Sequence, residues 1–465
     1  MFSPSSKVFL SPPNAMLEKI LLVLSSLLLS IWLMRETIAL RNILLVTCAI
    51  ISIFYLVKNF HELFVKIKIP LKNWMPIILI GLLFIWVVIH LFFFSYEPIL
   101  QLKELSSTWL RSFMACIIGF TVGLIINKNP NRYNWLMFAL ISGFLMLFYQ
   151  YVGLVWQSGN LFQQMWWVSI YWGKINQVLL GALFIAGSLA FYESKYSIKN
   201  TSKSTGVGLR IFTQSALYLT GILLTLHCFV FEIDSRNGIG ISTILFLIFF
   251  LRFLLGAIAR GTHSNWQFAT IPVLLLTMMG FFAYQQAQNN IGWKTALEDM
   301  QISAQVNKYK NWQATPATPV FTPTGRQIPI NTYERTAWVV VAAQTIHRHP
   351  LGYGLLHNAF GRTIKLDIAT SDLTSSHNGW LDFSLSFGII GLFLLLGSLI
   401  CTLSLSFASN MATRLSVFWS SVSLLLCYTL GELMVYHGVE FLIFWLSLLP
   451  PLLFEGLSKA SKVVL

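Results

Sequence analysis

The sequence predicts an all-α polytopic membrane protein with about twelve transmembrane helices and one long extramembrane loop. Of its 465 residues, 56% are hydrophobic and only 10% are charged, whereas a soluble domain carries about 25% charged residues. Apolar runs recur from residue 17 to residue 455. Because a bilayer admits only helices or closed barrels, and runs of about 20 apolar residues select helices, these runs are expected to span as helices.

The predicted spans follow from hydropathy over windows of about 20 residues. They are 16–34, 42–57, 74–95, 109–127, 134–155, 175–192, 211–231, 238–258, 267–286, 379–406, 414–431 and 438–455. The second run is short, so an interfacial or re-entrant segment is an alternative there. The N-terminus has no convincing small-residue cleavage site, and the first run is expected to be a retained helix. Three regions result, namely an N-terminal membrane region (1–286), a loop domain (287–377) and a C-terminal membrane region (378–465).

Basic residues indicate the orientation. One alternating set of connections is rich in lysine and arginine, for example at Lys58, Lys66, Lys68 and Lys72, and the other set of short connections is poor in both. The positive-inside rule therefore places both termini in the cytoplasm and the loop 287–377 in the periplasm. The net charge of +14 is then an orientation signal and an attraction to membrane lipids, so a nucleic-acid partner is not expected.

Metal and cofactor motifs are not visible. The five cysteines lie in or beside apolar runs, and no pair has metal-ligand or redox spacing. The His-Glu-x-x-His zinc pattern and the phosphate loop of nucleotide-binding proteins are both missing from the sequence. We expect neither a metal nor a cofactor.

The long loop divides into two parts. Residues 301–332 are polar and hold four prolines, so this part is expected to bury little and to let the helix that follows it move as substrates enter. Residues Tyr333–Pro350 have helical periodicity, which predicts an amphipathic helix over the membrane mouth, ended by Pro350. The residues on its apolar side are Trp338, Val341, Ala342 and Ile346, and the glycines that follow, suited to tight turns or close approach to a ligand, are Gly352, Gly354 and Gly361.

Two arginines are candidates for binding phosphate. Arg236 lies in "DSRNG" at a span mouth, beside a helix N-terminus, and a guanidinium matches phosphate oxygens. The alternatives are an arginine that reaches lipid head groups or one that pairs with Glu232 or Asp234. Arg335 lies in the first turn of the amphipathic helix, where a pair with Glu334 is the alternative.

His377 precedes the span that begins near residue 379. A neutral imidazole there suits a general base, although His377 or Ser376 could instead cap the helix. Asp382 shares a helix face with Asn378 and Leu385, and could orient His377 or a bound sugar. Gly388 and Gly391 are most simply small residues that admit a neighbouring helix.

Further polar residues lie on the same predicted side. Lys174, Asn176 and Gln177 lie at another span mouth, next to an aromatic segment, Gln163–Lys174, that fits either an interfacial belt or sugar stacking. Glu432, His437 and Glu440 either join an acceptor site or stabilise a turn.

Three motifs together resemble a known family. They are "SRNG", "YERTAWVVVAAQTIHRHPLGYG" and "HNGWLDFSLSFGIIG", in which His-Asn is followed by nine residues and Gly-x-x-Gly. In this order they resemble the bacterial O-antigen ligase and polymerase superfamily, most strongly over 231–405. The first half is similar only in its spans and in "ALRNILL". After Gly391 this sequence has Leu392-Phe393, where ligases often have small hydroxyl residues. The resemblance therefore does not decide between a ligase and a polymerase.

The resemblance implies a GT-C-like inner-membrane glycosyltransferase with a periplasmic site. It implies that Arg236 and Arg335 bind the diphosphate of an undecaprenyl-diphosphate-linked glycan, that His377 is the base, and that lipid A–core oligosaccharide is the acceptor. Ser376, Asn378, Asp382 and Trp338 are then expected to contact substrate. Two arginines at the leaving group would make a divalent metal unnecessary, and a single displacement would invert the sugar.

Three other functions remain alternatives. The same donor chemistry serves an O-antigen polymerase and a protein O-oligosaccharyltransferase. A secondary transporter is the alternative outside enzymes. Its signs are ionisable residues at the bilayer midplane and internal repeats, and the sequence shows neither clearly.

Overall fold

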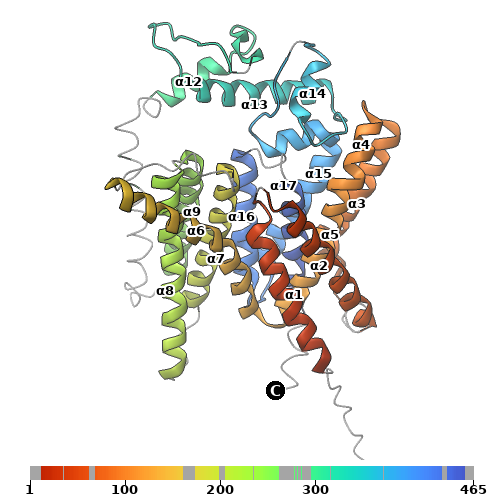
Figure 1. Ribbon diagram of the computed structural model, residues 1–465, viewed down its shortest axis with the longest axis vertical. Coiled ribbons are helices and arrows are strands. Elements are labelled where there is room, and N and C mark those ends of the chain that lie inside the picture. The colour runs from red at the N-terminus through yellow and green to blue at the C-terminus, as the bar shows by residue number, and fades with distance from the viewer. Residues whose placement is uncertain are drawn as a thin grey trace, which may run out of the picture.

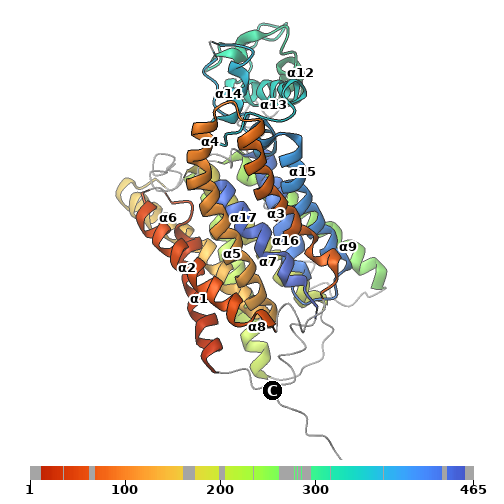
Figure 2. The ribbon, with the colours of Figure 1, turned by 90° about the vertical axis from the view of Figure 1, so that its right-hand side faces the viewer.

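The computed structural model of the chain is built from helices and loops, with isolated β-bridges such as that between Phe321 and Gln327. It describes residues 12–34, 36–61, 69–160, 173–197, 205–233, 235–260, 277, 280, 284, 295–314, 316–369, 371–431 and 437–455. Figure 1 shows a bundle of long helices with a smaller helical part at one end, and Figure 2 shows the same arrangement from the side. We call this smaller part, residues 295–377, the lobe.

The bundle and the lobe are formed by separate stretches of chain. The bundle contains α1 (Pro12–Ile31), α2 (Ile38–Lys58), α3 (Leu71–Phe93), α4 (Pro98–Glu104), η2 (Leu105–Trp109), α5 (Leu110–Lys128), η3 (Pro130–Arg132), α6 (Tyr133–Ser158), α7 (Lys174–Ser197), α8 (Thr205–His227), η5 (Cys228–Glu232), α9 (Arg236–Arg260), α15 (Gly379–Ala408), α16 (Arg414–Leu430), α17 (Gly438–Leu448) and η7 (Pro450–Leu453). The lobe contains α12 (Ala296–Ser303), η6 (Lys310–Gln313), α13 (Ile330–Arg348) and α14 (Ala359–Lys365).

The helices confirm a polytopic membrane protein. Within the described residues, eight are long and apolar enough to cross a bilayer, and Arg414–Leu430 and Gly438–Leu453 are shorter apolar helices. The predicted short span 42–57 is part of a 21-residue helix of spanning length, α2. Helices lie at eleven of the predicted spans. The remaining one, 267–286, falls outside the described residues but for 277, 280 and 284, and the aromatic stretch 163–172 lies outside them as well.

Close helix packing at the centre of the bundle depends on small residues. A Cβ on Gly119 of α5 would lie 2.2 Å from the Phe444 carbonyl oxygen of α17, and one on Gly123 would lie 2.4 Å from that of Leu448. This Gly-x-x-x-Gly spacing lets the two backbones touch, as is common between membrane helices. This contact holds α17 in the interior of the bundle, and every residue of α17 from Gly438 to Leu448 is buried.

The lobe has a hydrophobic core of its own. Trp312, Val320 and Ile328 are buried there together with Trp338 of α13. The Trp338 Nε1 donates to the Trp312 carbonyl oxygen at 2.9 Å. The prediction that 301–332 buries little is therefore wrong, although the stretch is largely irregular. The prediction of an amphipathic helix is confirmed, because α13 buries one side, and it ends just before Pro350.

Two glutamates of α4 and its N-terminal turn hold the lobe to the bundle. Glu104 accepts hydrogen bonds from the backbone N–H groups of Leu356, at 2.8 Å, and His357, at 3.0 Å. Glu97 accepts from the Tyr353 hydroxyl at 2.7 Å and also pairs with Arg362. These bonds fix the turn after α13 against the end of the bundle.

α15 is broken where that turn enters it. Gly388 has φ 72° and ψ −177°, outside helical geometry. The turn replaces the lost helical bonds, because Tyr353 N donates to Leu385 O at 2.8 Å, Gly354 N donates to Ser386 O at 2.7 Å, and Ile389 N donates to Pro350 O at 2.9 Å. Backbone groups freed by the break are thus satisfied, as a membrane environment requires.

This break corrects the expectation for Gly388 and decides between the two alternatives for Gly352, in favour of a tight turn. Gly388 does not serve a neighbouring span, since a Cβ there would lie 2.5 Å from the Pro350 carbonyl oxygen in the inserted turn. Gly352 approaches the α15 backbone and not a ligand, because its Cβ would lie 2.5 Å from the Gly388 nitrogen. Gly391 does meet a neighbouring helix, with Trp86 of α3 3.5 Å from its Cβ position.

Candidate functional site

A cavity of about 600 Å³ lies between the lobe and the end of the bundle. Its walls come from the first turns of α7 and α9, the last turn of α16, and the facing sides of α12 and α13. In Figures 1 and 2, α13 lies across this end of the bundle. Three cationic side chains line the cavity: Lys174, Arg236 and Arg335.

The "SRNG" sequence explains how Arg236 is held. Ser235 caps α9, because its Oγ accepts from Gly238 N at 3.1 Å. Asn237 Nδ2 donates to the Leu430 carbonyl oxygen at the end of α16, at 2.7 Å. Gly238 lies against the ring of Phe229, where a Cβ would be 2.8 Å from a ring carbon. The neighbours of Arg236 thus fix the backbone, and its own side chain faces the cavity.

Within the described residues, neither arginine forms a close ion pair with the glutamate considered above. Glu232 pairs with His227, and Glu334 accepts from the Ala317 N–H at 2.9 Å; Asp234 lies outside the described residues. Burial, and then the positive charge of Arg236, lower the pKa of Arg335, and the negative charge of Glu334 opposes this shift. Two guanidinium groups thus repel each other across one cavity, and the charge of Glu334 only partly offsets that of Arg335, an arrangement that suits a multivalent anion.

His377 stacks on Trp338, with ring centroids 5.1 Å apart and an interplanar angle of 21°. Burial, and then the positive charge of Arg335, lower the pKa of His377 to about 4. The imidazole is therefore neutral at pH 7 and can accept a proton. His377 is not among the described residues that line the cavity, but it feels the charge of Arg335, which does line it.

Asn378, and not Ser376 or His377, caps α15. Its Oδ1 accepts from Trp380 N and Leu381 N, both at 3.1 Å, and its Nδ2 donates to the Thr429 carbonyl oxygen at 2.9 Å. The side chain that was expected to contact substrate therefore joins the start of α15 to the end of α16.

Asp382 acts on the loop before α15. It accepts from Ser375 Oγ at 2.8 Å and from Ser376 N at 2.9 Å, and Ser375 Oγ accepts from His377 N at 3.1 Å. Asp382 thus orients His377 through Ser375 and the backbone. Ser376, Trp338, Asn378 and Asp382 all lie outside the described cavity lining, so the geometry gives them supporting positions around His377 and Arg335.

Lys174 is a cavity residue that the sequence interpretation assigned to a different span mouth. It begins α7 and lines the same cavity as both arginines. Asn176 donates to the Leu33 carbonyl oxygen at 3.2 Å, and Gln177 is buried. The sequence did hold a signal for Lys174, because it is a cation at the start of a span, on the side of the membrane whose short loops hold few basic residues. Arg236 was identified by the same kind of position.

A second charged cluster ties three helices together. Glu440 of α17 accepts from Arg111 Nε of α5 at 2.7 Å and from His437 Nδ1 at 3.0 Å. His437 Nε2 lies 2.7 Å from the Arg41 Nη2 of α2. His437 and Glu440 therefore stabilise the bundle, and they do not line the described cavity; Glu432 lies outside the described residues.

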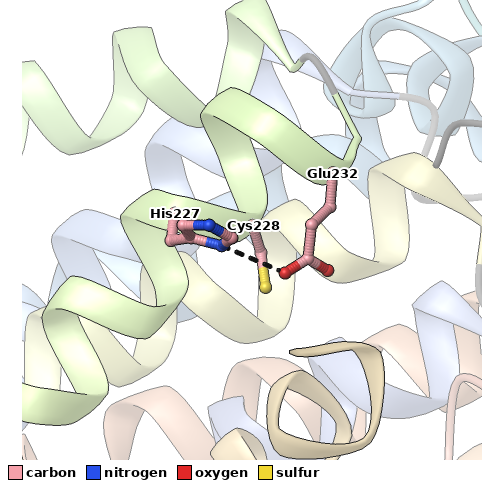
Figure 3. Close-up of side chains that lie close together, drawn as sticks. All are labelled: His227, Cys228 and Glu232. Atoms are coloured by element: carbon pink, nitrogen blue, oxygen red, sulfur yellow. Dashed lines mark hydrogen bonds and ion pairs between the residues drawn. The ribbon is translucent and has the colours of Figure 1, made fainter. Parts of the chain in front are cut away.

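A third cluster was missed by the search for zinc motifs. His227, Cys228 and Glu232 converge where α8 passes into η5, as Figure 3 shows. Their spacing follows a π-helical turn and matches no standard metal pattern, so only the folded chain reveals it.

The fold and the cavity define an all-helical, multi-pass membrane protein with a cationic cavity under a folded lobe. No protein-family model matches the chain, and no curated protein matches it. The activity therefore has to follow from the chemistry of the cavity and from the sequence motifs that surround it.

Proposed function

We propose that the protein is an inner-membrane glycosyltransferase that moves O-antigen glycan from undecaprenyl diphosphate to lipid A–core oligosaccharide, on the periplasmic side. The observation that carries the proposal is the pair Arg236 and Arg335, which line one cavity and form no close ion pair with the described glutamates nearby. A diphosphate offers several anionic oxygens to such a pair. The three motifs that resemble the O-antigen ligase and polymerase superfamily support the same donor.

The arginines act on the leaving group. As the bond between the anomeric carbon and the phosphate oxygen breaks, negative charge develops on the departing undecaprenyl diphosphate. Guanidinium groups already held in place stabilise that charge without reorganisation, and the loss of one such donor typically costs about 10²–10³ in rate. Lys174, in the same cavity, adds a third positive charge to the surface that meets the donor.

His377 acts on the nucleophile. The acceptor hydroxyl attacks the anomeric carbon, its oxygen forms the new glycosidic bond, and His377 takes the proton, a role worth about 10²–10⁴ in rate. A single displacement of this kind inverts the anomeric centre. Because the charge of Arg335 contributes to the low pKa of His377, a bound diphosphate would offset that charge and raise the basicity of the imidazole. The base would then be strongest when the donor is in place.

The deciding experiment combines purified protein, a lipid-linked glycan donor and a core acceptor. We expect Arg236→Ala to weaken donor binding, and His377→Ala to abolish transfer while donor binding is retained. Arg348→Ala is a matched control, because Arg348 lies on α13 but pairs with Asp367 outside the cavity. Unchanged donor affinity in Arg236→Ala would defeat the diphosphate assignment, and full transfer by His377→Ala would defeat the base assignment.

A gene deletion separates the enzymes that use this donor. Loss of a ligase leaves lipid-linked polymer and bare core. Loss of a polymerase leaves core with a single repeat unit, and loss of a protein O-oligosaccharyltransferase leaves lipopolysaccharide intact. Bare core with accumulated polymer is the result expected here, and either other phenotype would overturn the ligase assignment.

A further inference from the structure

His227, Cys228 and Glu232 form a compact set of metal-ligand side chains outside the cavity. One donor atom from each lies within 4.8 Å of the others. His227 Nδ1 lies 3.2 Å from Glu232 Oε1, and Figure 3 shows the Cys228 sulfur on the same side of the turn as both. Tetrahedral zinc with bonds of about 2.0 Å to nitrogen and oxygen and about 2.3 Å to sulfur needs donors roughly 3.2–3.6 Å apart. Small side-chain rotations would bring the three donors to these separations.

The local backbone produces this convergence. Cys228–Glu232 is a π-helical turn, and Ile233 N donates to the Cys228 carbonyl oxygen five residues earlier, at 2.9 Å. A π-turn holds more residues than an α-turn, so side chains five positions apart come to one side, and such turns are frequent at functional sites. In a regular α-helix, His227 and Glu232 would point in different directions.

Burying these polar side chains costs free energy unless a further group binds them. Cys228 and Glu232 are both 0% exposed. Glu232 Oε2 is buried and has no hydrogen-bond partner among the described residues. A buried carboxylate with an oxygen left unsatisfied is unfavourable, and its neighbours here include the thiol of Cys228 and the imidazole of His227, both of which bind metals once deprotonated.

We propose that His227, Cys228 and Glu232 bind a divalent first-row transition metal ion, with zinc as the best fit. A thiolate, a carboxylate and a neutral imidazole balance the charge of a dication, which suits a site of low dielectric. Sulfur and nitrogen donors favour zinc over magnesium or calcium. Binding releases the thiol proton of Cys228, and water completes the coordination because three protein ligands leave one position open.

The position of the cluster indicates a structural consequence for Arg236. Phe229 lies between two of the ligands and accepts from Ser235 N at 2.8 Å through its carbonyl oxygen, while its ring packs on Gly238. A metal held by the π-turn would therefore stiffen the segment that presents Arg236 to the cavity. The three ligands do not line the described cavity, so the metal would act as a brace and take no part in glycosyl transfer.

The test measures metal binding directly, on the purified full-length protein in detergent. After chelation and reloading with zinc, elemental analysis should find about one zinc per chain, and cobalt should give the near-ultraviolet thiolate-to-metal band. Cys228→Ser should lose the band and lower zinc affinity at least tenfold. Cys48→Ser is the matched control, since Cys48 is another fully buried cysteine, on α2, and it should bind as the unaltered protein does.

A second variant covers the case in which Cys228→Ser fails to fold. Glu232→Gln keeps the size and hydrogen-bonding capacity of the side chain but removes its charge, and it should also lose at least tenfold in zinc affinity. Zinc should raise the melting temperature of the unaltered protein and not that of either variant. Without stoichiometric metal and a cobalt–thiolate band in the unaltered protein, the cluster is a hydrogen-bonded ion pair only and the proposal fails. Binding by Cys228→Ser equal to that of Cys48→Ser would also overturn it.

Discussion

Asn237 and Asn378 donate hydrogen bonds to consecutive carbonyl groups at the end of one helix. Asn237 Nδ2 bonds to Leu430 O at 2.7 Å, and Asn378 Nδ2 bonds to Thr429 O at 2.9 Å. The last carbonyl groups of a helix have no partner within it, so α16 offers them to side chains. Each asparagine directly follows a candidate functional residue, Arg236 in one case and His377 in the other. Both asparagines are therefore fixed to the end of α16, which positions Arg236 and His377 relative to each other.

Replacing each asparagine by aspartate should separate the two roles. Asn378→Asp keeps the oxygen that caps α15 but puts an acceptor against the Thr429 carbonyl oxygen, so His377 should be displaced and transfer should slow. Asn237→Asp should displace Arg236 and weaken donor binding instead. We expect a loss of roughly tenfold in kcat for the first and in donor affinity for the second, which corresponds to about 1.4 kcal/mol each. Initial rates measure kcat, and donor titrations measure the affinity for the donor. If both variants lost the same one of these two quantities, the two separate roles would be contradicted.

The pH dependence of transfer should report the environment of His377. Burial and the charge of Arg335 lower its pKa to about 4, so the neutral form needed for proton abstraction persists well below pH 6. We expect kcat/KM, which reflects the free enzyme, to stay level from pH 7 to about 5 and to fall near pH 4. Arg335→Gln removes the repelling charge, so the acid limb should move to higher pH. Arg335→Lys keeps the positive charge, so its acid limb should stay near pH 4. An acid limb at the same pH in both variants would show that Arg335 does not control His377.

Hydropathy predicted helices at the apolar runs, and motif spacing singled out two of the residues that line the cavity, Arg236 and Arg335, because both signals are local. A span needs only a run of apolar side chains, and Arg236 and Arg335 were recognisable from short motifs and their predicted side of the membrane. The end of α16, which anchors Asn237 and Asn378, could not be predicted, because its free carbonyl groups leave no trace in its side chains.

Features that depend on two distant segments were predicted wrongly. The break at Gly388 is invisible in an apolar run, since only the inserted turn from Pro350 to Gly354 satisfies its backbone. Burial in 301–332 was missed because Trp312, Val320 and Ile328 lie on irregular chain without a repeating pattern. The period that identified α13 has no counterpart there.

Trp338 should couple the stability of the lobe to the position of His377. Its ring stacks on the imidazole and its Nε1 donates to the Trp312 carbonyl oxygen at 2.9 Å. Trp338→Phe keeps a stacking ring and loses one hydrogen bond, at a cost of about 1 kcal/mol. Trp338→Ala loses the stack and opens a cavity, at a cost of about 3–5 kcal/mol. Thermal unfolding in detergent measures both, and transfer should fall much more in the alanine variant. Equal transfer in the two variants would show that the stack does not position His377.

Gly388 should be intolerant of any side chain. Its φ of 72° and ψ of −177° lie in a region open essentially to glycine, and a Cβ would lie 2.5 Å from the Pro350 carbonyl oxygen. Gly388→Ala is expected to cost at least about 1–3 kcal/mol from backbone strain alone, and to expel the turn that fixes the lobe to α15. Gly81→Ala is the matched control, because Gly81 lies in α3 with nothing within 4 Å of its Cβ position, and alanine there should stabilise the helix by up to about 1 kcal/mol. Thermal unfolding in detergent compares the two variants. A Gly388→Ala protein with the same melting temperature as the Gly81→Ala control would refute the role of the break.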